Sequence, residues 1–138
     1  MIAYTSVYGN TKRAVQALAE ELKALGKRVT VTDLARDDMA EAVEDAFRYG
    51  TLVLATTTYN GDVFPFMREF LYELTERGYC NRRIAMIENG SWAPVAAKKM
   101  CAMLEGSKGI AFVEPTVTIR SAMTDENRAE LRALAEAL

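Results

Sequence analysis

The residues best placed to do chemistry lie in one short segment near the start of the chain. Ile2–Thr11 reads IAYTSVYGNT, and a segment with helical periodicity follows from Lys12. The apolar start suits a strand, and the hydroxyl-rich stretch with one glycine suits a loop. Backbone N–H groups in the first turn of a helix have no partner, and the helix dipole favours an anion there. The order of strand, loop and helix therefore predicts a site for a phosphate ester.

This loop differs from the common nucleotide-binding loops. A Walker loop requires G-x-x-x-x-G-K-[ST], and the dinucleotide fingerprint requires three glycines at fixed spacing. The segment has a single glycine, Gly9. Taken alone, it also fits an ordinary strand-to-helix turn with Asn10 as the helix cap, so the phosphate reading needs support from the rest of the chain.

The chain contains no histidine. This excludes Ser-His-Asp and Cys-His catalysis and removes the commonest protein ligand of zinc and non-haem iron. We therefore expect no metal site and no catalytic side chains, with any chemistry supplied by a bound cofactor. Cys80 and Cys101 form no C-x-x-C motif and are expected to be reduced thiols.

Charge and hydropathy exclude several classes of partner. The net charge is −2 and the isoelectric point is about 5.3, which argues against nucleic acid or an anionic membrane as the main partner. No apolar stretch approaches the roughly 18 residues needed to span a bilayer. The first residues lack the basic and apolar regions of a signal peptide. We expect a cytoplasmic protein.

The remaining pattern predicts the elements that must hold the loop. Half of the 138 residues are hydrophobic, which suits a single domain, 1–138, with a buried sheet. Five apolar runs are expected as strands, at Met1–Thr5, Arg28–Asp33, Leu52–Thr57, Arg83–Glu88 and Ala111–Ile119. Five periodic segments are expected as helices, at Thr11–Leu25, Asp37–Tyr49, Phe64–Arg77, Ala93–Leu104 and Thr124–Leu138. This alternation predicts an α/β fold with a doubly wound parallel sheet and helices on both faces.

Individual residues predict where the helices begin and end. Gly26 and Gly50 are expected just after helices as left-handed caps. Asp37 and Thr124 are expected as N-caps, and Pro94 in a first helical turn. The first strand is unusually short for a central strand. We therefore expect the chain to begin inside a longer polypeptide, the alternative being a natural domain with a short strand.

Ligands of an open parallel sheet bind beyond the carboxyl ends of its strands. Three loops are predicted there: Ser6–Thr11, Thr56–Asp62 and Glu88–Ala93. The second and third carry large aromatics, Tyr59 and Trp92, which a flat apolar ring between them would bury. The three loops together predict a site for a phosphorylated flat ring.

At these residues the chain resembles the flavodoxin family. The resemblance rests on Ser6–Thr11, on Thr58–Gly61 followed by Phe64 and Pro65, and on Gly90–Trp92. It is most similar to the flavodoxin domain that ends the A-type flavoproteins, also called flavodiiron proteins. The resemblance implies a five-stranded parallel sheet in the order 2-1-3-4-5 and FMN as the cofactor.

The resemblance also implies a set of FMN contacts in the three loops. The phosphate would be held by Ser6, Val7, Tyr8, Gly9, Asn10 and Thr11. The ring would lie between two walls, formed by Thr57, Thr58, Tyr59, Asn60 and Gly61 and by Asn89, Gly90, Ser91, Trp92 and Ala93. Two departures concern the ring contacts: Thr56-Thr57-Thr58 replaces the more usual Ser-Pro-Thr, and the third loop has fewer glycines around Trp92.

Two further expectations concern the reduction potential of the bound flavin. Because glycine adopts positive φ freely, the Asn60–Gly61 peptide is expected to reverse its orientation when the flavin gains an electron and a proton. The carboxylates of Glu88 and Asp62 would disfavour an anionic reduced ring and lower its potential, unless they are simply solvated surface charges.

The function that the resemblance implies is an FMN-binding electron-transfer domain. It would pass electrons to a flavodiiron-type oxygen or nitric oxide reductase centre outside this sequence. Its partners would be a rubredoxin-like donor or a diiron domain, and any homo-oligomer would form through the parent protein. The alternatives are a free-standing flavodoxin, a small FMN-dependent reductase or, less favoured, a flavin-free interaction module. A phosphoacceptor receiver domain is disfavoured, because Thr5-Ser6 and Thr56-Thr57 stand where its acidic residues belong.

Overall fold

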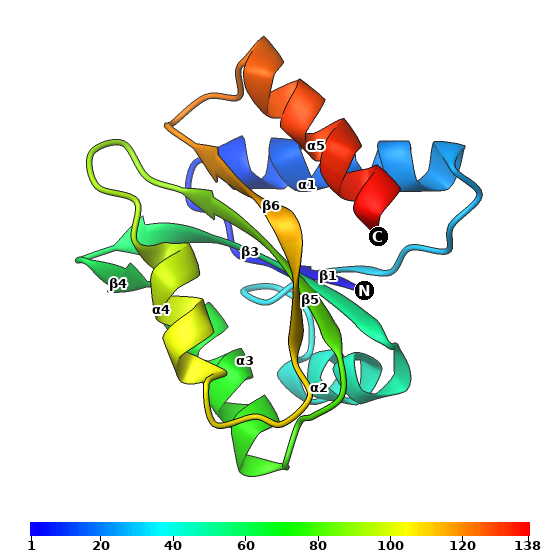
Figure 1. Cartoon of the computed structure of the whole chain (residues 1–138). Helices are drawn as coiled ribbons and strands as arrows, with labels where there is room; N and C mark the ends of the chain where they lie inside the picture. The colour runs from blue at the N-terminus through cyan, green and yellow to red at the C-terminus, as the bar shows by residue number, and fades with distance from the viewer.

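The computed structural model describes residues 1–138 and has an α/β architecture (Figure 1). The elements follow in the order β1 (Ile2–Tyr4), α1 (Asn10–Ala24), β2 (Val31–Asp33), α2 (Met39–Arg48), β3 (Thr51–Tyr59), β4 (Asp62–Val63), α3 (Pro65–Glu76), β5 (Arg83–Asn89), α4 (Ala96–Met103), β6 (Ala111–Ile119) and α5 (Asp125–Ala137). Every predicted strand and helix is present, with ends that differ by up to three residues. None of the helices is both long enough and apolar enough to cross a membrane.

Five parallel strands form the sheet in the order β2-β1-β3-β5-β6. This is the predicted order 2-1-3-4-5 when only the parallel strands are counted, so the fold prediction is confirmed. The additional strand, β4, pairs antiparallel with the end of β3. The carboxyl ends of β1, β3 and β5 are neighbours at one edge, which brings the three predicted loops together.

Both faces of the sheet are buried. Along β3, Leu52 and Leu54 point to the face covered by α2, α3 and α4, while Val53 and Ala55 point to the face covered by α1 and α5. All four side chains are at most 2 % exposed. A strand buried on both sides is apolar at every position rather than at alternate ones, which is why β3 and β5 could be recognised as continuous apolar runs.

Most helix boundaries follow the predicted signals. Thr124 caps α5, with its hydroxyl accepting the Asn127 N–H in a reciprocal capping box. Gly26 ends α1 with φ of +77°. Two predictions were wrong by a small margin: Asp38, not Asp37, caps α2 by accepting the Glu41 N–H, and Gly50 does not adopt positive φ, because Tyr49 after α2 is already extended.

Tyr79 gives the fold a predictable response to alkaline pH. Its side chain is buried, its hydroxyl donates to the Ala46 carbonyl oxygen at 3.3 Å, and its ring packs edge-on against Phe47. Burial raises the pKa of Tyr79 to about 12, against a smaller opposing effect of Arg82. Since the folded-state pKa lies above the unfolded value near 10, the stabilisation is complete below about pH 10 and is lost as the pH rises towards 12.

We therefore expect the free energy of unfolding to fall as the pH is raised from about 9.5 to about 11.5. The loss in the wild type should exceed the loss in Tyr79→Phe by about 1–2 kcal/mol. Urea unfolding at the two pH values measures the difference, and the comparison removes the contribution of lysine titration. Equal losses in the two proteins would contradict this assignment.

Candidate cofactor-binding site

The loop from β1 to α1 is wrapped around the hydroxyl of Ser6. The Ser6 Oγ accepts hydrogen bonds from the backbone N–H groups of Gly9, at 3.1 Å, and Lys12, at 3.2 Å. Gly9 is the N-cap residue of α1 and adopts a left-handed conformation with φ of +89°. Glycine takes this conformation at little steric cost, and it directs the chain from the loop into the helix.

The same loop presents unpaired hydrogen-bond donors. The backbone N–H groups of Val7, Tyr8, Asn10 and Thr11 have no protein acceptor, and the first turn of α1 contains no acidic residue. Free N–H groups at a helix start form a site for an anion. The donor set therefore fits a phosphate group without using a positively charged side chain.

A hollow of about 220 Å³ opens beside this loop. The predicted site residues that line it are Ser6, Val7, Tyr8, Asn10, Thr11, Thr57, Thr58, Asn89, Gly90 and Ser91. The other predicted residues, Gly9, Tyr59, Asn60, Gly61, Trp92 and Ala93, are not part of its lining. The hollow joins the three loops, as the sheet topology predicts. Its lining contains no carboxylate, lysine or arginine.

Threonine hydroxyls link the first two loops below the hollow. Thr5 Oγ1 and Thr56 Oγ1 lie 2.6 Å apart, and both residues are fully buried. Thr11 Oγ1 and Thr57 Oγ1 lie 3.3 Å apart nearer the surface. These contacts fix the start of α1 against the end of β3.

The second predicted loop is a β-hairpin rather than an irregular loop. Thr58 and Tyr59 pair with Val63 and Asp62. The turn residues Asn60 and Gly61 have φ of +49° and +71°, a pattern typical of a type I′ turn. The Asn-Gly dipeptide is the strongest short-range hairpin signal in a sequence, so this strand pair was predictable but was missed.

The start of α4 is fixed by two side chains from neighbouring strands. Thr58 Oγ1 accepts the N–H groups of Val95, at 3.0 Å, and Ala96, at 3.3 Å. Glu88 Oε2 accepts the Ala97 N–H at 2.8 Å. α4 therefore begins three residues later than predicted, and Pro94 precedes its cap instead of lying in its first turn.

Glu88 has a structural role that its sequence position did not reveal. It is 7 % exposed, and its second oxygen, Oε1, accepts the Thr118 hydroxyl at 2.8 Å. Both oxygens are thus engaged, one with α4 and one with β6. Asp62, the other predicted acid, forms an ion pair with Arg68 at the surface. Glu88 is therefore not a solvated charge, whereas Asp62 is a surface charge held in an ion pair.

The third loop is held in place by the turn between β6 and α5. The Asn89 side chain donates to the Ser121 carbonyl oxygen at 2.9 Å and accepts the Ser121 N–H at 3.2 Å. The hydroxyls of Ser91 and Ser121 lie 2.9 Å apart. Ser121 also lines the hollow and was missed from the sequence, although the end of the fifth parallel strand had to lie at this edge of the sheet.

Aromatic side chains at the rim of the site are open to solvent. The exposed fractions are 93 % for Trp92, 88 % for Tyr8 and 47 % for Tyr59. The ring of Phe64 packs edge-on against that of Tyr59, with the ring centres 5.3 Å apart. Exposed aromatics flanking a polar hollow are typical of a binding surface for a flat, apolar group.

Gly90 is a position where a side chain would force its neighbours to shift. An added Cβ would lie 3.0 Å from Pro94 Cα and 3.3 Å from Thr58 Oγ1. We expect Gly90→Ala to displace the third loop and to lower the free energy of unfolding by about 1–2 kcal/mol. Gly106→Ala, where a Cβ meets open space, is the matched control in urea unfolding. Equal stability of the two variants would contradict the packing argument.

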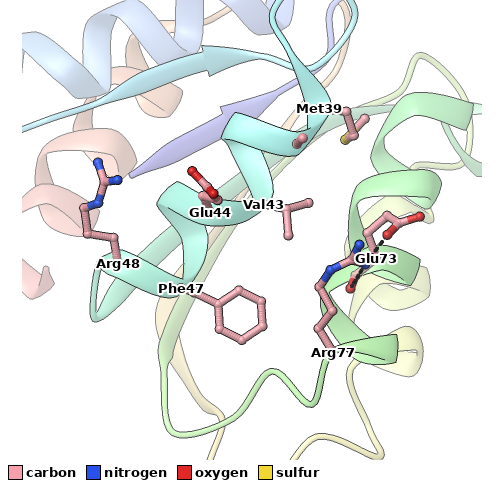
Figure 2. Close-up of a pocket in the computed structure, with 8 residues that line it drawn as sticks. Met39, Val43, Glu44, Phe47, Arg48, Glu73 and Arg77 are labelled. Atoms are coloured by element: carbon pink, nitrogen blue, oxygen red, sulfur yellow. Dashed lines mark hydrogen bonds and ion pairs between the residues drawn. The ribbon is translucent and has the colours of Figure 1, made fainter.

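A larger hollow, of about 920 Å³, lies between α2 and α3 (Figure 2). Met39, Val43 and Phe47 form its apolar side, and the ion pair of Glu73 with Arg77 lies on the opposite helix. It lies beside the helices rather than at the carboxyl ends of the strands. None of the predicted site residues lines it.

The fold and the site together define a flavodoxin-type domain. The family profile described as "Flavodoxin domain" matches residues 1–100. The chain therefore belongs to the flavodoxin domain family. Membership of this family supports the expectation that the cofactor is FMN.

Curated relatives are larger proteins. The chain is 24% identical over 106 residues to "Anaerobic nitric oxide reductase flavorubredoxin" from Escherichia coli O1:K1 / APEC, a match that covers 75% of this chain and 22% of that protein. The protein of the same name from Shigella dysenteriae serotype 1 (strain Sd197) matches with the same identity and coverage. The chain thus spans about a fifth of the length of these relatives.

Solved structures of two kinds share the fold. Rubredoxin oxygen:oxidoreductase from Desulfovibrio gigas superimposes with a TM-score of 0.91 at 18% identity, covering 99% of this chain and 34% of that one. Flavodoxin 1 from Bacillus cereus superimposes with a TM-score of 0.85 at 18% identity, covering 99% of this chain and 93% of that one. The same architecture therefore occurs both as a part of larger enzymes and as a complete small protein.

Proposed function

We propose that this domain binds FMN and transfers electrons. The observation that carries the proposal is the loop Ser6–Thr11, in which residues with unpaired N–H groups line a hollow flanked by exposed aromatics. The loop would hold the FMN phosphate, and Tyr59 and Trp92 would cover the two sides of the ring. When bound, FMN supplies reversible one- and two-electron redox chemistry.

The residues of the chain would bind and orient the cofactor rather than react. The residues lining the hollow offer hydroxyls, amides and backbone N–H groups, without a carboxylate or a basic side chain. Such neutral donors hold a phosphorylated ring in place without an acid–base pair for a second substrate. This favours electron transfer over chemistry on an additional small molecule.

Reduction of the reconstituted domain tests this proposal. We expect the FMN-loaded protein to be reduced reversibly at an electrode and to show no NADH oxidation in the absence of another protein. Turnover of NADH by the domain alone would favour the alternative of a small FMN-dependent reductase.

We further propose that the electrons pass to a flavodiiron-type oxygen or nitric oxide reductase centre. Support comes from the names of the relatives, a nitric oxide reductase and a rubredoxin oxygen:oxidoreductase. We expect any such iron centre to lie outside this sequence, because the chain has no histidine to bind iron. A rubredoxin-like donor or a diiron domain would then be the partner.

A free-standing flavodoxin is the second candidate, because Flavodoxin 1 from Bacillus cereus is covered over 93% of its length. The mass of the native polypeptide in cell extracts, detected with an antibody against this domain, discriminates between the two. A band several times larger than 15.3 kDa supports the flavodiiron role. A band at the mass of this chain supports the free-standing carrier.

The Asn60–Gly61 peptide flip remains a prediction, and the observed turn type indicates which residue the flip would strain. Reversing this peptide would convert a type I′ turn into type II′, which puts Asn60 in a conformation that favours glycine. We expect Asn60→Gly to ease the reversal and to raise the first reduction potential by tens of millivolts, since about 1 kcal/mol is equivalent to roughly 40 mV for one electron. Potentiometric titration measures the shift, and unchanged potentials would contradict the flip.

A further inference from the structure

The third loop is a short bridge between two fixed ends. β5 ends at Asn89 and the N-cap of α4 is Val95, so residues 90–94 alone span the gap. Asn89 is held by the turn after β6 through its two hydrogen bonds with Ser121. The side chains of residues 91–93, including Trp92, are exposed. The position of the Trp92 ring therefore depends on where the two ends of the bridge are fixed.

The far end of the bridge is fixed by a residue of the hairpin. The N-cap residue of α4, Val95, makes no capping hydrogen bond with its own side chain. Thr58 Oγ1 accepts the N–H groups of Val95, at 3.0 Å, and Ala96, at 3.3 Å. A hydroxyl 37 residues earlier in the chain thus does for α4 what a serine or threonine usually does at the N-cap.

The same threonine belongs to the first wall of the proposed ring site. Thr58 pairs with Val63 in the β3–β4 hairpin and lines the hollow. It also abuts the third loop, because a Cβ added to Gly90 would lie 3.3 Å from Thr58 Oγ1. In Figure 1 the amino end of α4 lies beside this hairpin. One side chain therefore connects the two walls between which the ring would lie.

The start of α4 differs from the start of α1 in how its donors are used. The N–H groups of Asn10 and Thr11 in α1 have no protein acceptor. Those of Val95 and Ala96 are accepted by Thr58, and the next N–H is accepted by Glu88. Donors that are already paired are not free to bind an anion. At α4 they serve instead to fix the helix against β3 and β5.

We propose that Thr58 is a positioning residue whose hydroxyl sets the separation between the hairpin and the third loop, and with it the affinity for the flavin ring. This role rests on the proposed FMN site. The hydroxyl acts through the backbone at the start of α4, so it governs the ring end of the ligand and not the phosphate end. Without it, one end of the bridge is released while Asn89 still holds the other.

Flavin affinities of two Thr58 variants test this role. Thr58→Val keeps the shape of the side chain without its hydroxyl, whereas Thr58→Ser keeps the hydroxyl. Thr58→Val is expected to fold, because Ala96 and Met100 still anchor α4 in the core, each at 0 % exposed. We expect it to weaken the binding of FMN and of riboflavin by the same factor, about tenfold, as the loss of one or two net hydrogen bonds implies.

The serine variant and the two ligands make the result specific. Thr58→Ser is expected to bind both flavins within about threefold of the wild type. Fluorescence quenching during titration measures each affinity. Wild-type affinity in Thr58→Val would overturn the positioning role. A loss confined to FMN would overturn it as well, because the effect would then lie at the phosphate.

A helix cap remote from the hollow controls for a general loss of stability. Asp38 caps α2 by accepting the Glu41 N–H at 3.0 Å, and it is absent from the lining of the hollow. Asp38→Ala therefore also removes a cap and lowers stability, but it is expected to leave both flavin affinities unchanged. Equal weakening of flavin binding by Asp38→Ala and Thr58→Val would overturn the positioning role.

Hydrogen exchange of the flavin-free protein tests the anchor without the cofactor. In Thr58→Val the N–H groups of Val95 and Ala96 are expected to exchange at least about tenfold faster than in the wild type, while that of Glu41 is unchanged. Unchanged exchange at Val95 and Ala96 would overturn the proposal. If the wild type binds neither flavin, the proposed function fails together with this role. If Thr58→Val binds FMN as the wild type does, the positioning role alone fails.

Discussion

Replacing Glu88 with alanine is expected to lower the free energy of unfolding by about 3 kcal/mol. The substitution leaves the Ala97 N–H and the Thr118 hydroxyl without the acceptors that they now have at 2.8 Å. An unpaired buried donor costs about 1–3 kcal/mol, and the loss of a carboxylate at the start of α4 removes a favourable interaction with the helix dipole. Urea unfolding at neutral pH measures the loss.

Two further variants give this experiment its controls. Glu88→Gln keeps one side-chain oxygen as an acceptor and is expected to lose about half as much stability. Glu136→Ala removes an exposed acid of α5 that forms no ion pair and is expected to change stability by less than about 0.5 kcal/mol. If Glu88→Ala were as mild as Glu136→Ala, Glu88 would not be holding α4 in place.

Gly9→Ala is expected to weaken FMN binding by at least about tenfold. Left-handed backbone costs an alanine about 1–2 kcal/mol, and the new Cβ would lie 3.2 Å from the Arg13 guanidinium. Relaxation of this strain would rotate the free N–H groups of Asn10 and Thr11 away from the phosphate. Titration with FMN, followed by the quenching of flavin fluorescence, measures the affinity.

The comparison with riboflavin isolates the phosphate contribution. Riboflavin has the same ring but no phosphate, so Gly9→Ala should change its affinity much less than that of FMN. Gly106→Ala, a glycine without positive φ and with open space around it, should leave both affinities unchanged. Equal weakening of FMN and riboflavin by Gly9→Ala would contradict the role of this loop.

The architecture was predictable because buried strands and helices each have a characteristic pattern of apolar residues in the sequence. Strands such as β3 and β5 are apolar on both faces, and the helices between them repeat apolar residues every three or four positions. Parallel strands separated by helices then bring the loops after β1, β3 and β5 to one edge. This reasoning placed ten of the predicted residues around one hollow.

The remaining features depend on contacts between residues distant in the sequence. Thr58 and Glu88 lie at the ends of β3 and β5, where site residues are expected, and their side chains hold the start of α4. Thr58 also lines the hollow. Ser121 reaches the hollow only because it pairs with Asn89 across 32 positions. No local pattern reports such hydrogen bonds, whereas the missed hairpin at Asn60–Gly61 had a local signal.

Binding of FMN and of riboflavin to the unmodified protein tests the central claim most directly. The account predicts that FMN binds in a one-to-one complex with quenched fluorescence, and that riboflavin binds at least about a hundredfold more weakly, because the loss of several charge-assisted hydrogen bonds costs a few kcal/mol. A protein that fails to bind FMN, or that binds the two flavins equally well, would contradict the assignment of Ser6–Thr11 as a phosphate site.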